Sequence, residues 1–199
     1  MESYLARVEV DASRGLPGFE MVGLLGSEVK EARERIRVAL KNAEAAPPVR
    51  ITVNISPASL HKEGTSYDLP VAVGILVSTG MIPQDYVKDS MIAGELGLSG
   101  EIKPVRGILP MALEAKKQGL KRCIVPLENL AEAQLVEGIK ILGAGCLIQL
   151  IELLQCRDGV PENLLYKDIM YMEKTEKNTD ADSMSGNVAA NMERTADLA

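Results

Sequence analysis

Aromatic residues are nearly absent from this chain of 199 residues. It contains no Trp, and its single Phe is Phe19. A hydrophobic core must therefore consist of aliphatic side chains packed between helices and strands. Stacking of nucleic-acid bases on aromatic rings is not expected as a main activity.

Residues that build disulfide frameworks and metal sites are scarce as well. The three cysteines, Cys123, Cys146 and Cys156, lie far apart without a C-x-x-C motif, and His61 is the only histidine. We therefore expect no disulfide framework and no bound metal ion. Unpaired thiols are typical of the reducing cytoplasm, where we place the chain. No apolar run is long enough to span a bilayer and the N-terminus lacks a signal-peptide pattern, so no membrane contact is expected.

Charge divides the chain into two parts. The net charge is −6, and residues 157–199 contain 5 Lys+Arg against 9 Asp+Glu, which leaves the preceding part close to neutral. From about Glu173 onward polar residues follow one another without an apolar period. We predict one folded domain over residues 1–156 and a disordered acidic tail over residues 157–199.

Apolar periodicity predicts an alternation of strands and helices. A period of two predicts strands at residues 5–11, 19–22, 50–55, 122–125 and 140–142, and a hairpin from residues 91–95 and 101–102. Apolar residues at helical spacing predict a helix that begins at Ser27 and another between Gly107 and Gly119. Further helices are predicted at residues 69–77, 130–136 and 147–154. This alternation predicts an α+β fold in which a mixed β-sheet is packed with helices.

One segment joins charged residues, a glycine and a serine directly to a long apolar run: Lys62-Glu63-Gly64-Thr65-Ser66-Tyr67-Asp68-Leu69-Pro70. A serine hydroxyl is a weak nucleophile until an adjacent base takes its proton. The favoured structural interpretation is that the Ser66 hydroxyl caps the following helix. Asp68 either complements the positive end of that helix, which we favour, or pairs with Lys62.

Five stretches, in this order, carry a family resemblance. They are Val10-Asp11 with Gly15-Leu16-Pro17, Arg50-Ile51-Thr52-Val53-Asn54, the Lys62 to Pro70 segment, Gly94-Glu95-Leu96-Gly97-Leu98-Ser99-Gly100, and Pro104-Val105-Arg106-Gly107-Ile108-Leu109-Pro110. From about Val8 to Leu154 the chain resembles the N-terminal domain of magnesium-chelatase-like AAA+ proteins of the ComM group. More distantly it is similar to the proteolytic domain of Lon. The resemblance implies a Lon-protease-like α+β fold, shared with one domain of a small-subunit ribosomal protein.

The Lon pattern places the nucleophile on Ser66 and its lysine partner on Leu109, which has no proton to exchange. We therefore expect no catalytic residue. The alternative is a serine peptidase in which a relocated lysine, Lys62 or Lys103, reaches Ser66. Without catalysis, the resemblance leaves partner contact as the role of the motif residues Lys62, Glu63, Gly64, Ser66, Asp68, Gly94 and Glu95.

Two departures from the family pattern limit what the resemblance implies. Family members usually begin with one further strand, so a sheet edge is expected to be missing. Their ATPase module follows this domain, whereas the chain contains no G-x-x-x-x-G-K-[ST] phosphate loop. We expect no cofactor here, with ATP and Mg²⁺ held in the AAA+ module of relatives. We expect that module, in the same or a neighbouring protein, to be the partner of this domain. The resemblance implies that the assembly is hexameric.

The helix that begins at Ser27 has the one local concentration of basic residues. In a ring assembly this face could contact the phosphates of single-stranded or branched DNA. Glu28, Glu31 and Glu34 interrupt it, and such mixed charge usually forms a solvated face held by ion pairs. The basic residues are Lys30, Arg33, Arg35, Arg37 and Lys41, of which Lys30, Arg33, Arg37 and Lys41 are the candidate DNA contacts.

These observations favour a non-catalytic Lon-like accessory domain that serves assembly and the engagement of a partner or DNA. The full-length relatives imply ATP-dependent DNA branch migration or helicase activity in transformation and recombination. The serine peptidase and a plain assembly scaffold remain as alternatives.

Overall fold

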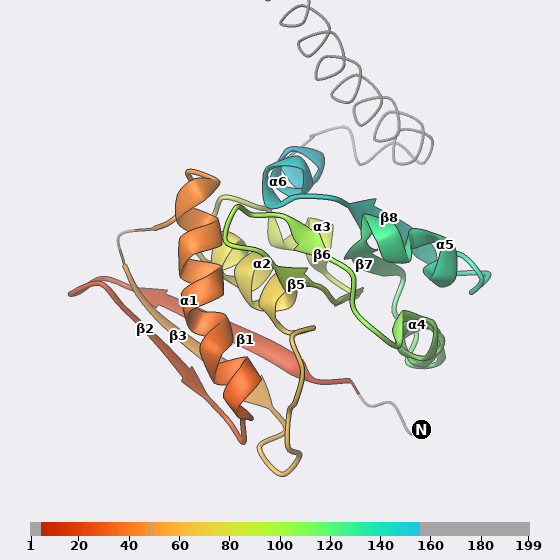
Figure 1. Ribbon diagram of the computed structural model, residues 1–199, viewed down its shortest axis with the longest axis horizontal. Coiled ribbons are helices and arrows are strands. Elements are labelled where there is room, and N and C mark those ends of the chain that lie inside the picture. Colours follow the sequence, from red (N-terminus) through yellow and green to blue (C-terminus); the bar gives the residue numbers. More distant parts are fainter. Residues whose placement is uncertain (1–4, 48, 156–199) are drawn as a thin grey trace, which may run out of the picture. The chain divides into compact units, whose positions relative to one another are not determined.

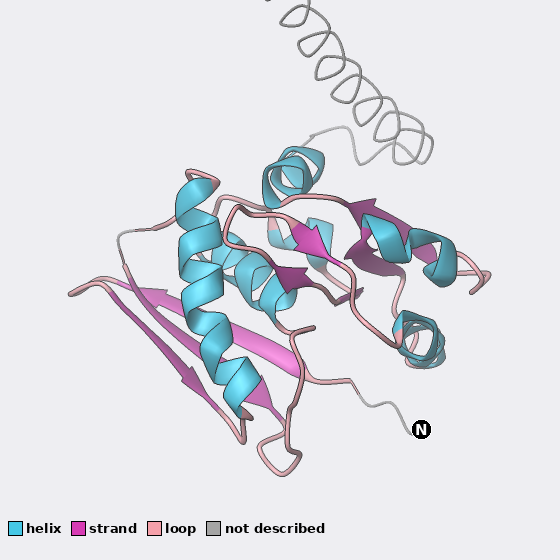
Figure 2. Cartoon of the chain, in the orientation of Figure 1, coloured by secondary structure: helices cyan, strands magenta, loops and turns pink. Residues whose placement is uncertain are grey.

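The computed structural model of the chain describes residues 5–47 and 49–155. The tail predicted over residues 157–199, with its predicted disorder, lies outside the described residues. The described part is a mixed α+β arrangement in which the strands form separate groups, shown in magenta in Figure 2. The prediction of an α+β fold with helices packed on sheet is confirmed.

The first sheet contains β1 (Arg7–Ser13), β2 (Gly18–Val22) and β3 (Arg50–Ser56) in the order β1-β3-β2. Strand β1 is antiparallel to the central strand β3, and β2 is parallel to it. One face of β3 is buried through Ile51, Val53 and Ile55, because its side chains alternate between two faces. Helices α1 (Ser27–Asn42) and α2 (Asp68–Ser78) cover this face (Figure 1).

The second sheet is parallel and contains β4 (Ser90–Ile92), β7 (Arg122–Pro126) and β8 (Lys140–Ala144) in the order β4-β7-β8. The short helix α3 (Gln84–Val87) precedes β4, and the predicted elements include no counterpart for it. Helix α4 (Ile108–Lys117), the 3-10 turn η1 (Leu127–Asn129), α5 (Leu130–Ala133) and α6 (Leu147–Gln155) complete this half. Its core is aliphatic, as the composition predicts, and includes Met91, Ile108, Ala112 and Val125.

The predicted strand over residues 91–95 is wrong, because the chain divides there between two sheets. Met91 lies in β4, whereas Glu95 lies in β5 (Glu95–Leu96), which forms a hairpin with β6 (Ile102–Lys103). Gly94 separates the two strands: its N–H donates to the Ser66 carbonyl at 3.1 Å and its carbonyl accepts from Leu69 N–H at 3.0 Å. The backbone is thus bonded to the start of α2 instead of continuing the strand. The predicted single mixed sheet is accordingly two three-stranded sheets and a hairpin.

Two glycines bound α4 as predicted. Gly107 at its start has φ +81° and Gly119 beyond its end has φ +78°, both in the left-handed region that favours glycine. The next predicted helix is shorter than expected, because α5 ends at Ala133 and a 3-10 turn precedes it. Within the described ranges no helix has both the length and the apolar character that a membrane span needs.

Helix α2 packs closely against β1 at Gly74, and this contact provides a test of the packing. A Cβ atom at position 74 would lie 2.6 Å from Cγ2 of Val10. Val10 is β-branched and stiff, so it cannot move aside cheaply. We expect Gly74→Ala to lower the free energy of unfolding by about 1 to 2 kcal/mol, because overpacking outweighs the better helix propensity of alanine.

Urea denaturation of Gly74→Ala, Val10→Ala and the double variant checks this expectation. If the overlap is the cause, the double variant loses at least about 1 kcal/mol less than the sum of the single losses. Additive losses would contradict the proposed contact.

Candidate functional site

The start of the motif segment is bonded to the residues that lead into α1. The backbone N–H of Lys62 donates to the carbonyl of Leu24 at 3.0 Å, and its own carbonyl accepts from the N–H of Gly26 at 2.9 Å. A side chain at position 26 would crowd this approach, since a Cβ there would lie 3.1 Å from the Lys62 carbonyl oxygen. The loop before the motif and the N-terminus of α1 are therefore one packed unit.

Lys62 is buried, although lysines in loops are usually exposed. Its side chain has 0% exposure, and Nζ donates a hydrogen bond to the carbonyl of Pro57. A buried ammonium group is costly unless polar groups satisfy it, so this bond ties the side chain to the loop that follows β3. The lysine thereby stabilises the loop from residue 57 to residue 62.

Ser66 has no lysine bonded to its hydroxyl. Lys62 Nζ donates to the Pro57 carbonyl, and Lys103 lies exposed in the hairpin. Among the described residues neither amine hydrogen-bonds Ser66 Oγ. The relocated-lysine alternative requires such a contact directly or through one water. The geometry gives it no direct support.

The predicted cap by the Ser66 hydroxyl is wrong. The residue that precedes α2 is Tyr67, and no side-chain cap bond is formed there. The N–H of Asp68 instead donates to the carbonyl of Thr65 at 3.2 Å, which closes a tight turn before the helix. Ser66 contributes through its backbone, because its carbonyl accepts the bond from Gly94 N–H at 3.1 Å.

Asp68 is the first residue of α2, as the first-turn interpretation predicts, but its ionic partner is Arg35 and not Lys62. Arg35 Nε donates to Oδ2 at 2.7 Å and Nη2 donates to Oδ1 at 3.0 Å, a bidentate geometry. The N–H of Leu96 in β5 donates to Oδ2 at 3.2 Å. The carboxylate therefore joins α1, α2 and the hairpin.

The pair is mostly removed from water, with side-chain exposures of 22% for Arg35 and 0% for Asp68. Burial raises the pKa of the Asp68 carboxyl, and the hydrogen bonds from Arg35 and Leu96 offset only part of that rise. The hydrogen bond to Asp68 raises the pKa of the Arg35 guanidinium, which stays charged. The charged form of the Asp68 carboxylate therefore depends on the hydrogen bonds and the charge of Arg35.

The ion pair of Arg35 is not predicted from the sequence, which counts Arg35 among the basic residues of α1 but not among the candidate DNA contacts. The side chain points toward α2. A signal was present: Arg35 lies three residues after Ala32 and four before Ala39, and both alanines are fully buried. An arginine in such a stripe indicates a buried partner.

The glycine and glutamate of the motif have separate roles. Gly64 has φ +83°, and its N–H donates to Oε2 of Glu28 in the first turn of α1 at 2.8 Å. Glu63 is exposed, with Oε1 lying 3.3 Å from His61 Nε2. Glu95 is half-buried at the hairpin, where its charge contributes to the raised pKa of Asp68. These side chains therefore do not form one shared cluster.

Ligand chemistry for ATP and a metal ion is not assembled here. In the described part of the chain no group of three or more His, Cys, Asp or Glu residues could hold a metal ion. The sequence also lacks the glycine-rich phosphate loop with its lysine. Within residues 5–47 and 49–155 no such site is assembled, and the expectation that this chain holds neither ATP nor Mg²⁺ stays a prediction. Cys123 is buried, and burial raises the pKa of its thiol to about 11, which keeps it protonated at neutral pH.

Leu109, at the position that the Lon pattern assigns to lysine, lies in α4. Its side chain is partly buried against the core of the second sheet, and its N–H donates to Oε1 of Glu132 at 2.9 Å. Packing against this core therefore explains the apolar side chain at position 109.

The four candidate DNA contacts lie exposed on α1. Arg33 and Arg37 flank Glu34, with nitrogen to oxygen distances of 3.6 and 2.9 Å. Lys30 and Lys41 are exposed near the two ends of the helix. The mixed-charge surface predicted from the sequence is present, and DNA contact stays a prediction.

Comparison with known proteins gives consistent matches. A family model described as subunit ChlI of Mg-chelatase matches residues 8–129. Competence protein ComM of Haemophilus influenzae is 38% identical over 162 residues, which cover 81% of this chain and 32% of that protein. YifB of Escherichia coli, an uncharacterized protein, is 42% identical over 142 residues, which cover 71% and 27%. Lon protease 2 of Bacillus subtilis is 33% identical over 87 residues, which cover 43% and 15%.

The chain spans about a third of the length of the ComM relative and about a quarter of that of the YifB relative. The residues matched by the family model, 8–129, include the motif segment, the hairpin and the basic helix.

The Arg35–Asp68 pair makes stability depend on pH in a defined direction. Removing the guanidinium in Arg35→Ala should raise the pKa of Asp68 further, because burial then acts with less opposition. A carboxyl with a raised folded-state pKa favours the folded state when protonated, and this contribution is lost as pH rises through the raised pKa. We expect Arg35→Ala to cost about 2 to 4 kcal/mol at neutral pH and distinctly less near pH 4.

Urea denaturation at both pH values measures the two costs. Arg33→Ala is the matched control, since Arg33 is half-exposed and its pair with Glu34 should contribute less than about 1 kcal/mol. A cost of Arg35→Ala that is equal at the two pH values would contradict a buried ion pair.

Proposed function

Because the chain belongs to the family of the ChlI subunit of Mg-chelatase, we propose that it is a non-catalytic, Lon-like accessory domain of a ComM-like AAA+ protein. Its role is to assemble with the AAA+ module of the same or a neighbouring protein and to engage a partner or DNA. ATP and Mg²⁺ bind in that module, in an assembly that is hexameric. The work of the whole assembly is ATP-dependent DNA branch migration in transformation and recombination.

One observation carries the non-catalytic part of this proposal. Lys62, the lysine of the serine motif, is fully buried and bonded to the Pro57 carbonyl, and Leu109 stands where the Lon pattern has its lysine. A serine hydroxyl without a neighbouring base is unreactive. Ser66 therefore lies in a motif whose two buried charged residues, Lys62 and Asp68, are engaged in holding the fold.

The contacts of the motif support an architectural role. Gly64 bonds to Glu28 of α1, Asp68 to Arg35 of α1 and to Leu96 of the hairpin, and Ser66 to Gly94. Three elements that are distant in sequence meet at this segment. A domain that fixes its surfaces in this way is suited to present them to a neighbouring module.

The exposed side of α1 supports DNA engagement. Lys30 and Lys41 have no acidic partner among the described residues, so their charges are available to phosphates. Arg33 and Arg37 share Glu34, which reduces their net contribution. Neutralised phosphates release counterions, so binding by these lysines would weaken as salt increases.

The serine peptidase alternative is tested by labelling. We expect a fluorophosphonate probe to leave Ser66 unmodified, since the hydroxyl has no base, and intact-mass spectrometry of the full chain measures the adduct. A serine protease treated in parallel controls for probe reactivity. An adduct that disappears in Ser66→Ala would establish a nucleophilic serine and overturn the non-catalytic proposal.

DNA engagement is tested by a salt series with forked DNA. We expect Lys30→Ala with Lys41→Ala to weaken binding and to reduce the slope of log affinity against log salt by about 1.4 to 1.8, because each lysine neutralises one phosphate. Fluorescence anisotropy of labelled DNA measures both quantities.

The matched control is Lys116→Ala with Lys117→Ala, which removes two exposed lysines from α4 and should leave the slope unchanged. An equal loss in both double variants would show unspecific attraction. An absence of salt-sensitive binding in the unaltered chain would favour the plain assembly scaffold.

A further inference from the structure

Four basic residues of α1 form one stripe along the exposed side of the helix. Lys30, Arg33, Arg37 and Lys41 follow one another at intervals of three, four and four residues, and all four are exposed. Residues at these intervals are neighbours on a helix surface, so the stripe is roughly 16 Å long. A row of cations of this length can face several successive phosphates of one nucleic-acid strand.

Glu34 lies within this stripe and is paired with both of its arginines. Arg37 donates to Oε2 of Glu34 through Nε at 3.0 Å and through Nη2 at 2.9 Å. Arg33 Nε lies 3.6 Å from Oε1. Each oxygen of the carboxylate therefore has one guanidinium beside it. Two arginines that converge on one carboxylate can also hold a phosphate, because the planar guanidinium matches both anions.

The other two acidic residues of α1 do not engage the stripe. Oε2 of Glu28 accepts the N–H of Gly64 at 2.8 Å, which ties this side chain to the motif segment. Glu31 is exposed, and among the described residues its carboxylate forms no ion pair with Arg33 or Arg37. Glu34 is therefore the acidic residue of this helix that a phosphate has to displace.

The contacts of Glu34 are open to water and can be exchanged. The side-chain exposures are 50% for Arg33 and 58% for both Glu34 and Arg37. Exposed ion pairs contribute little to stability, because water and salt screen them. A phosphate can replace this carboxylate without disturbing the fold, whereas the buried Asp68 keeps its partner Arg35.

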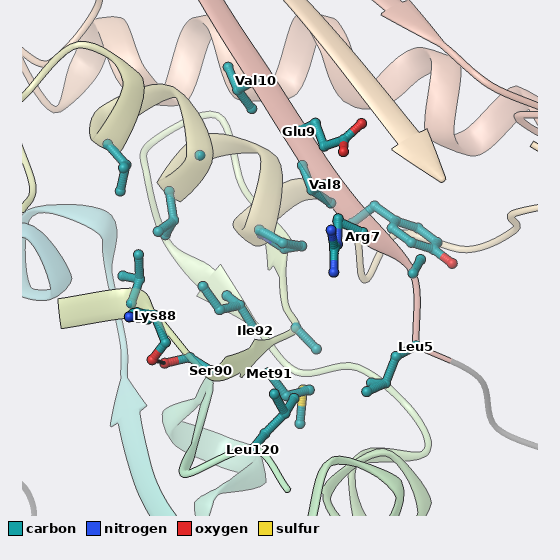
Figure 3. A pocket seen from close by; sticks show the side chains of 18 of the residues that line it. Leu5, Arg7, Val8, Glu9, Val10, Lys88, Ser90, Met91, Ile92 and Leu120 are labelled. Atoms are coloured by element: carbon teal, nitrogen blue, oxygen red, sulfur yellow. Dashed lines mark hydrogen bonds between the residues drawn. The ribbon is translucent and has the colours of Figure 1, made fainter. Parts of the chain in front are cut away.

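The groove that α2 borders, between β1 and β4, does not compete for such a ligand. Its lining contains two basic side chains, Arg7 and Lys88, and two acidic ones, Glu9 and Glu114. Figure 3 shows Arg7 and Glu9 on β1, with Lys88 on the other side of the groove. A lining without net positive charge does not attract a polyanion. The stripe on α1 fits a DNA strand better than this groove does.

We propose that Glu34 inhibits DNA binding by the free chain, because its carboxylate occupies the place in which Arg33 and Arg37 hold a DNA phosphate. A DNA strand that binds along the stripe displaces the carboxylate, so the affinity is lower than the four cations alone would give. The inference rests on the proposed function, in which α1 contacts DNA, and it names the residue that limits this contact.

Removing the charge of Glu34 in the full chain tests the proposal. Glu34→Gln keeps the size of the side chain and frees both arginines. We expect it to raise the affinity for fluorescein-labelled forked DNA by at least about fivefold, and to steepen the slope of log affinity against log salt by about 0.7 to 0.9, which corresponds to one further phosphate contact. Fluorescence anisotropy in a salt series measures both quantities.

Glu31→Gln is the matched control, because it removes the same charge from the same helix without freeing an arginine of the stripe. We expect its affinity for DNA to stay within about twofold of that of the unaltered chain. Equal gains in Glu31→Gln and Glu34→Gln would show a general effect of net charge and overturn the proposal.

A variant without the two arginines shows whether the gain depends on them. In the background of Arg33→Ala with Arg37→Ala, adding Glu34→Gln should change the affinity by less than about twofold. A gain that persists in this background would overturn the proposal. Circular dichroism confirms that each variant is folded, which we expect because the three changed side chains are exposed.

Other ligands and the proposed DNA role give separate outcomes. If Glu34→Gln raises the binding of fluorescein-labelled decaglutamate as much as that of DNA, the stripe is a site for acidic protein and the proposal is overturned. Salt-sensitive DNA binding that Glu34→Gln leaves unchanged overturns the inhibitory role alone. Absence of DNA binding in every variant overturns the DNA part of the proposed function, and this inference with it.

Discussion

The bidentate ion pair between Arg35 and Asp68 is the interaction on which the arrangement of the motif depends. It joins the middle of α1 to the first residue of α2, and the same carboxylate accepts the Leu96 N–H of the hairpin. Because Asp68 is fully buried, its charge is tolerated only while these donors remain in place. The pair therefore constrains three elements at once, beside the backbone hydrogen bond that joins Ser66 to Gly94.

Much of the fold could be predicted from apolar periodicity. The boundaries of β3, α1 and α2 agree with the pattern within two residues, because each buries one regular face or is apolar all round. The family resemblance is confirmed as well. The break at Gly94 could not be predicted, since it arises from hydrogen bonds to Ser66 and Leu69 that no local pattern encodes.

The candidate site was harder to predict than the fold. Lys62 and Arg35 are charged, and charged side chains are seldom buried, so local patterns placed Arg35 on the surface and left Lys62 available for chemistry. Their partners lie on different loops and helices, at sequence separations that only tertiary packing can bring together. The stripe formed by Ala32, Arg35 and Ala39 was the one local indication. The predicted cap by the Ser66 hydroxyl is wrong for a related reason. The N–H of Asp68 already donates to the carbonyl of Thr65.

The central claim concerns Lys62, the lysine of the serine motif, whose buried side chain has a structural role. The most direct test is the free energy of unfolding of Lys62→Ala and Ser66→Ala, measured by urea denaturation at neutral pH. We expect a loss of at least about 2 kcal/mol for Lys62→Ala, which removes one of the two hydrogen bonds to the Pro57 carbonyl and opens a cavity, and a change within about 0.5 kcal/mol for Ser66→Ala. Unchanged stability in Lys62→Ala would contradict a structural role for this lysine, because a side chain that the fold does not need would be free to serve chemistry.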